Sequence, residues 1–165
     1  MTLQENELIK IRRDLHQIPE IGLEEYETSD YLLKIINGLP QENLEIKRWK
    51  TAILVHLNGE NKNYTIGYRT DIDGLPVEEK TGLPFSSKHE GRMHACGHDI
   101  HMTVALGVLS YFASHRPKYN MTFIFQPAEE NASGGMKLYQ SGELDEWMPD
   151  EIYALHDNPQ LPAGT

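Results

Sequence analysis

The chain has 165 residues, of which 39% are hydrophobic and 24% charged, as expected for one folded domain rather than a disordered segment. Its net charge of −10 leaves no basic stripe for a nucleic-acid backbone, and its longest apolar run, around residues 103–113, is too short to cross a bilayer. The polar, acidic first residues do not form a signal peptide, and one cysteine cannot form an internal disulfide. We therefore predict a cytoplasmic protein without a nucleic-acid or membrane partner.

The first half of the chain predicts two helices, three strands and a long loop. Apolar residues recur every three or four positions over residues 5–17, which favours an amphipathic helix that ends before Pro19, and a second helix includes residues 31–39. Strand-like runs follow at residues 44–49, 52–57 and 64–69. The Gly-, Pro- and charge-rich residues 71–92 are predicted to be a loop.

The second half alternates between strands and helices. An apolar helix is predicted through residues 104–112, a strand at 121–125, a short helix at 136–140 and a strand at 151–155. This order predicts an α/β fold with a mixed, largely parallel sheet flanked by helices.

Four polar motifs fall where predicted strands end or where the following helix begins. They are Arg-Thr-Asp-Ile-Asp at 69–73, His-Ala-Cys-Gly-His-Asp-Ile-His at 94–101, Gln-Pro-Ala-Glu-Glu at 126–130 and Leu-His-Asp at 155–157. Ligands bind at the carboxyl edge of strands in open α/β sheets. The motifs are therefore expected to meet in one site.

The second of these motifs contains Cys96 and His98, which are separated by a single glycine. Thiolate and imidazole are donors that zinc and its neighbours in the transition series prefer. Gly97 permits backbone angles that let both side chains turn toward one point. Two alternatives are a small buried hydrophobic role for Cys96 and a nucleophilic Cys–His pair, although a nucleophile would not require the carboxylates downstream.

Glu129 and Glu130 are adjacent, and on extended backbone their side chains would project to opposite sides. One could then bind a metal while the other moves a proton, the division of labour that metal-assisted hydrolysis needs. The alternative is a solvated acidic pair.

Asp71, two residues from Arg69, would share a strand face with it. Asp71 could accept a hydrogen bond from a metal-binding imidazole or form a structural ion pair with Arg69. His156 ends an apolar strand, where a lone histidine is usually a core residue, and only the other motifs favour it as a ligand. His94 and His101 could support the site or face solvent. The histidines without an assigned role are His16, His56, His89 and His115.

Together these motifs resemble the M20 family of metallopeptidases and aminoacylases, in its branch of N-acyl-amino-acid amidohydrolases. The segments that carry the resemblance are 12–16 with Pro19 and Glu20, 68–76, 93–99, 125–130 and 154–156. Within this branch, residues 12–25 and 46–51 are most similar to enzymes of lysine biosynthesis that deacetylate N-acetyl-L,L-diaminopimelate.

The resemblance implies a role for each residue. Cys96 would bridge two divalent metal ions (zinc, manganese, cobalt or nickel), and the further ligands would be His98, Glu130 and His156. Glu129 would be the general base and Asp71 would orient the metal shell. Arg69 stands where many relatives outside this branch place a ligating histidine, so it is not counted as a ligand. Asp99 and His101 match motif positions without an assigned role.

The resemblance also implies a domain organisation. Residues 1–165 would form the N-terminal part of the catalytic domain. A lid domain that binds substrate and forms homodimers, and a later catalytic segment with the last ligating histidine, would lie outside this sequence. Alternatives are a broader aminoacylase or carboxypeptidase, a closed structural-metal site, and a fragment that folds but is catalytically inactive because it binds metal incompletely.

Overall fold

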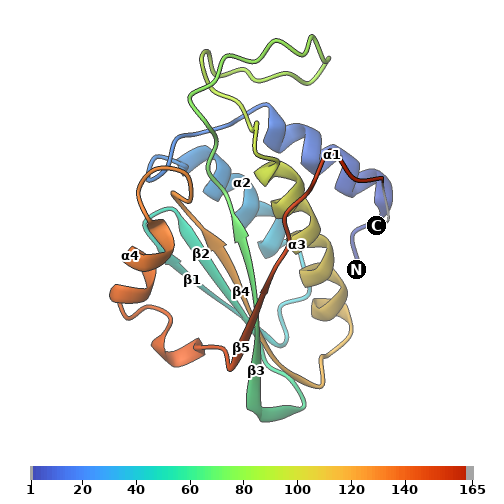
Figure 1. Ribbon diagram of the computed structural model, residues 1–165. Coiled ribbons are helices and arrows are strands. Elements are labelled where there is room, and N and C mark those ends of the chain that lie inside the picture. The colour runs from blue at the N-terminus through green and yellow to red at the C-terminus, as the bar shows by residue number, and fades with distance from the viewer. Residues whose placement is uncertain (1, 163–165) are drawn as a thin grey trace.

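The computed structural model describes residues 2–162, which form a sheet covered on both faces (Figure 1). The helices are α1 (Glu5–His16), α2 (Tyr26–Asn37), α3 (His98–Ser114) and α4 (Gly134–Gln140), with the 3-10 helix η1 at Asp145–Trp147. The strands are β1 (Leu44–Trp49), β2 (Ala52–Leu57), β3 (Asn61–Asp71), β4 (Tyr119–Gln126) and β5 (Glu151–Ala154).

Within residues 2–162 the five strands are ordered β1-β2-β4-β3-β5. β1 and β2 pair antiparallel, as do β2 and β4, whereas β3 is parallel to both β4 and β5. The predicted mixed α/β fold is confirmed. The carboxyl ends of β3, β4 and β5 consequently lie at one edge of the sheet.

Side chains that alternate along the strands enter two cores. One face of the sheet packs its residues, among them Val55 and Phe123, against α1, α2 and α3. The other face packs Leu54 and Ile124 against α4 and η1, including Trp147. Because successive strand residues point to opposite faces, the nearly continuous apolar runs of β2 and β4 fit strands that are covered on both sides.

The predicted elements are all present, with shifted boundaries. α2 begins at Tyr26 rather than near Tyr31, and β3 extends from Asn61 to Asp71. The largest difference is at α3, which begins at His98 rather than near Val104, so the polar motif itself forms the first helical turn. No helix in the described residues is long and apolar enough to span a membrane.

The loop after β3 projects beyond the sheet (Figure 1). An isolated bridge between Leu75 and Met93 closes its base, where each backbone N–H donates to the other residue's carbonyl. Its return arm leads directly into Cys96 and α3, so the loop ends at the carboxyl edge of the sheet.

Candidate metal centre

The four polar motifs converge at the carboxyl edge of the parallel strands, as predicted. Asp71 ends β3, Glu129 and Glu130 follow β4, His156 follows β5, and His98 begins α3. Potential ligand atoms of Cys96, His98 and His156 lie within 4.8 Å of one another, as do those of His98, Glu129 and Glu130. His98 therefore belongs to both groups.

Gly97 makes the approach of Cys96 and His98 possible. It has a φ of 81°, in the left-handed region that favours glycine, and α3 begins at the next residue. This turn leaves Cys96 partly exposed and places its Sγ 3.5 Å from His156 Nε2. Of the two backbone forms that would bring these side chains together, extended or tightly looped, the structure has the tight turn.

Both proposed histidine ligands direct Nε2 toward the cluster. His98 Nδ1 donates to the carbonyl oxygen of Asp73 at 2.8 Å, and His156 Nδ1 donates to that of Asp157 at 2.8 Å. Such hydrogen bonds fix the tautomer of a metal-binding imidazole and leave the other nitrogen free for a cation. Burial lowers the pKa of His98, but the carboxylates of Asp73 and Asp71 outweigh this effect and raise that pKa.

The extended backbone predicted for the Glu129–Glu130 pair is wrong. β4 ends at Gln126, Ala128 has a φ of 52°, and the two glutamates lie in a turn. A backbone N–H of Glu130 donates to Asp73 Oδ2 at 3.0 Å, which fixes the turn against the end of β3. Both carboxylates can consequently approach His98, with Glu129 more exposed than Glu130.

The donor set fits divalent cations. Glu130 Oε1 is buried without a hydrogen-bond partner among the described residues and lies 3.6 Å from His98 Nε2. Burial and the nearby carboxylate of Glu130 raise the pKa of the Cys96 thiol to about 12, so the thiol stays protonated at neutral pH without a cation. A coordinating metal ion deprotonates such a thiol and satisfies the orphaned oxygen.

Asp71 forms the ion pair with Arg69 and also contacts an imidazole, but that imidazole is not one of the proposed ligands. One carboxylate oxygen, Oδ2, pairs with Arg69 Nη1 at 2.9 Å, and Oδ1 faces His101 Nδ1 at 2.8 Å. The imidazole that Asp71 contacts most closely is therefore that of His101, because His98 Nε2 lies 3.7 Å away. Burial alone would raise the pKa of Asp71, but the neighbouring side chains of His101, His98 and Arg69 lower it.

Sequence reasoning missed a second buried network. His16, which had no assigned role, places Nδ1 2.6 Å from Asp99 Oδ2 and Nε2 3.3 Å from Glu79 Oε1, and Arg12 pairs with the same Asp99 oxygen at 3.1 Å. This network of side chains joins α1, the long loop and the first turn of α3. The 12–16 motif was its only local signal, because the partners are far apart in the sequence.

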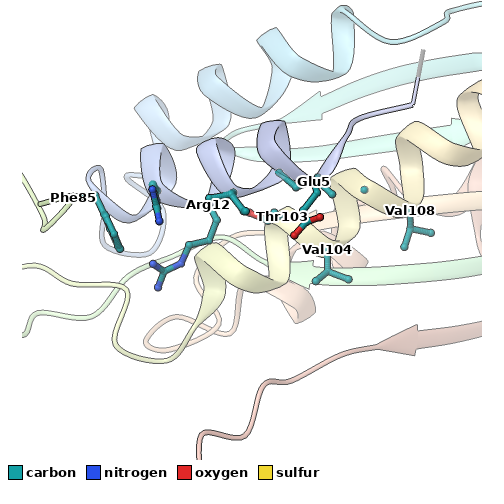
Figure 2. Close-up of a pocket in the computed structure, with 10 residues that line it drawn as sticks. Glu5, Arg12, Phe85, Thr103, Val104 and Val108 are labelled. Atoms are coloured by element: carbon teal, nitrogen blue, oxygen red, sulfur yellow. The ribbon is translucent and has the colours of Figure 1, made fainter. Parts of the chain in front are cut away.

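An apolar groove lies between α1 and α3 (Figure 2). It has a volume of about 730 Å³ and is lined by Leu8, Arg12, Phe85 and Val104, among others, but by none of the proposed metal ligands.

Comparison with known proteins identifies the family of the chain. The model of the peptidase family M20/M25/M40 matches residues 67–165, which contain all of the converging motifs. The chain belongs to this family. A solved family member is the YXEP protein of Bacillus subtilis, described as a dinuclear metal-binding peptidase, which is 38% identical with a TM-score of 0.87 over 95% of this chain and 44% of its own.

Curated relatives are more similar still. N-acetyldiaminopimelate deacetylase of Lactiplantibacillus plantarum is 66% identical over 99% of this chain and 44% of its own length. The protein of that name from Streptococcus uberis is 63% identical over 96% of this chain and 43% of its own length. The present chain thus spans less than half the length of these relatives.

Proposed function

We propose that the full-length protein is a metal-dependent amide hydrolase that removes the acetyl group from N-acetyl-L,L-diaminopimelate. The observation that carries this proposal is the 63–66% identity, across nearly the whole chain, to relatives named for that reaction. The donor cluster at the sheet edge supports the reaction class, because it combines metal-binding side chains with an exposed carboxylate. A cytoplasmic location and a homodimer stay predictions from the sequence.

We assign Cys96, His98, Glu130 and His156 as the residues that would hold two divalent cations, and Cys96 would be shared by both cations. When bound, these cations would supply Lewis-acid activation of water and of the scissile carbonyl. Zinc, manganese, cobalt and nickel all suit a mixed thiolate, imidazole and carboxylate site. The buried hydrogen bonds of His98 and the turn at Glu130 preorganise these donors.

Glu129 would act as the general base. Its carboxylate is beside Glu130 but more exposed, so it can face the substrate while Glu130 binds metal. A Glu129 carboxylate oxygen would take a proton from water as the water oxygen attacks the amide carbon. It would then return that proton to the leaving nitrogen as the C–N bond breaks, releasing acetate and diaminopimelate.

Replacement of the base tests the proposal. Glu129→Gln in the full-length protein should lower kcat by about 10²–10⁴-fold, the usual contribution of a positioned acid–base group, without changing cobalt affinity. Glu42→Gln, at an exposed position remote from the cluster, is the matched control. Normal activity of Glu129→Gln with metal bound would overturn the assignment.

Substrate preference tests the proposed specificity for N-acetyl-L,L-diaminopimelate. The full-length protein should hydrolyse N-acetyl-L,L-diaminopimelate more efficiently than N-acetylmethionine, by more than about 100-fold in kcat/KM, if polar groups of the diamino acid are recognised. Equal efficiencies would favour the broader aminoacylase function.

A further inference from the structure

His101 lies one turn beyond His98 on α3, and its side chain is 1% exposed. Each of its ring nitrogens lies beside a carboxylate. Nδ1 lies 2.8 Å from Asp71 Oδ1, and Nε2 lies 2.8 Å from Asp157 Oδ1. His101 is therefore close to the metal-binding cluster but occupied on both sides by carboxylates.

The two carboxylates come from different strands of the sheet. Asp71 ends β3 and is fixed by Arg69, whereas Asp157 lies three residues beyond the end of β5. Sheet pairing of β5 ends at Ala154, so the residues that follow need other contacts to hold them against the molecule. His101 supplies such a contact by joining Asp157 to the rigid end of β3.

The segment held in this way carries the proposed ligand His156. The side chain of His156 is 59% exposed, which gives it few neighbours to define its position. Its ring packs edge-on against His101 with centroids 4.6 Å apart, and its Nδ1 donates to the carbonyl oxygen of Asp157. Fixing Asp157 therefore directs His156 Nε2 toward Cys96.

Gly97 shows how closely Asp157 fits this place. A Cβ atom at Gly97 would lie 2.1 Å from Asp157 Oδ1, so the carboxylate packs directly against the backbone that precedes α3. The turn that presents Cys96 and His98 thus also leaves the space that Asp157 occupies.

We propose that His101 is a positioning residue that, by bridging Asp71 and Asp157, holds the ligand His156 in the metal centre. This inference rests on the proposed metal-dependent function and assigns a role to a motif residue that the reaction scheme does not use. His101 acts through His156 and does not contact substrate or metal itself.

Two substitutions of His101 separate its contact with Asp71 from its contact with Asp157. A glutamine amide nitrogen can take the place of Nε2, and an asparagine amide nitrogen that of Nδ1. His101→Gln should therefore retain the contact with Asp157, while His101→Asn should lose it. The matched control is His115→Asn, an exposed histidine at the end of the same helix.

The measurement is titration of the metal-free, full-length protein with Co²⁺, followed by the thiolate-to-cobalt charge-transfer band of Cys96. We expect His101→Asn to weaken binding by about 10–100-fold, the usual effect of removing a partner that orients a metal ligand. His101→Gln should recover most of the affinity. Asp157→Ala removes the carboxylate but keeps the backbone N–H that donates to His101 Nε2 at 3.1 Å, so it should cause part of the loss with less disturbance of the core. Urea unfolding in chelator checks that each variant is folded.

A double-mutant cycle distinguishes positioning from general structural damage. If His101 acts through His156, then His101→Asn should cause no further loss of cobalt affinity in a His156→Ala background. Additive losses, or unchanged affinity in folded His101→Asn and Asp157→Ala, would overturn the positioning role while leaving the proposed function intact. Failure of wild type to bind cobalt through Cys96 would overturn both.

Discussion

The antiparallel half of the sheet and the carboxyl edge of its parallel half both contain fully buried residues, but with opposite chemistry. All six residues of β2 are buried, and five of them are apolar. At the parallel edge, Asp71, Asp73, Asp99 and His101 are at most 2% exposed. The first region gains stability from burial itself, whereas the second must compensate each buried charge with a partner. Stability and chemistry are therefore concentrated in different parts of one sheet.

The largest expected effect comes from the apolar region. Phe123 is fully buried in β4 between β2 and β3, and its ring lies 5.8 Å from that of Tyr68. Phe123→Ala should lower the free energy of unfolding by about 3–5 kcal/mol, because it removes contacts and leaves a cavity. Urea denaturation measures the loss, and Phe123→Leu should lose much less. A reduced cobalt affinity in the fraction that remains folded would contradict the separation of the two regions.

Cys96→Ala tests whether metal binding at the polar edge can be lost without a loss of stability. Loss of a direct ligand should weaken cobalt binding by more than about 100-fold, since even the partners that orient ligands contribute 10–100-fold. Because Cys96 is partly exposed, the unfolding free energy in chelator should change by less than about 0.5 kcal/mol. Unchanged cobalt affinity would exclude Cys96 as a ligand, and a large stability loss would give it a structural role.

The two regions also differ in how well the sequence predicts them. Apolar runs predict the ranges of β1 and β2 correctly, because their burial is a property of consecutive residues. The position of the site could be predicted as well, since motifs after parallel strands must meet at one edge. The partners of His16 and His101 could not, because Glu79 and Asp157 come from distant segments that only the folded chain brings close. The turn at Glu129 could not be predicted either. It depends on the positive φ of Ala128, and positive φ is usually indicated in a sequence by a glycine, which is absent at this position.

A smaller effect is expected at Gly97, which has a positive φ and packs against the Asp157 carboxylate at the polar edge. Gly97→Ala places a side chain at a φ of 81° and a Cβ atom 2.1 Å from Asp157 Oδ1. The backbone strain alone should lower the unfolding free energy by about 1–2 kcal/mol, and displacement of Asp157 should weaken cobalt binding as well. Gly82→Ala is the matched control, because Gly82 also has positive φ but no atoms within 4 Å of an added Cβ. Equal cobalt affinities in the two variants would show that the close fit of Asp157 is not needed.

The smallest expected effect concerns two buried histidines with opposite pKa shifts. Despite burial, Asp71 and Asp157 raise the pKa of His101 at the polar edge. His56 in β2 stacks on Trp147 and contacts Thr122, and burial lowers its pKa. As pH falls through the ordinary histidine value of about 6.5, the unfolded chain gains a proton at His56 before the folded chain does, so stability is lost toward acid.

His56→Phe removes this proton uptake and keeps an aromatic ring against Trp147. Thr122 still donates its hydroxyl hydrogen to the carbonyl oxygen of Trp147 in this variant. The difference in unfolding free energy, wild type minus variant, should therefore decrease from pH 8 to pH 5 in urea titrations followed by tryptophan fluorescence. A difference that stays constant over this range would mean that His56 is as easily protonated in the folded protein as in the unfolded chain. The antiparallel half would then tolerate a charge without a partner, and its contrast with the polar edge would fail at this residue.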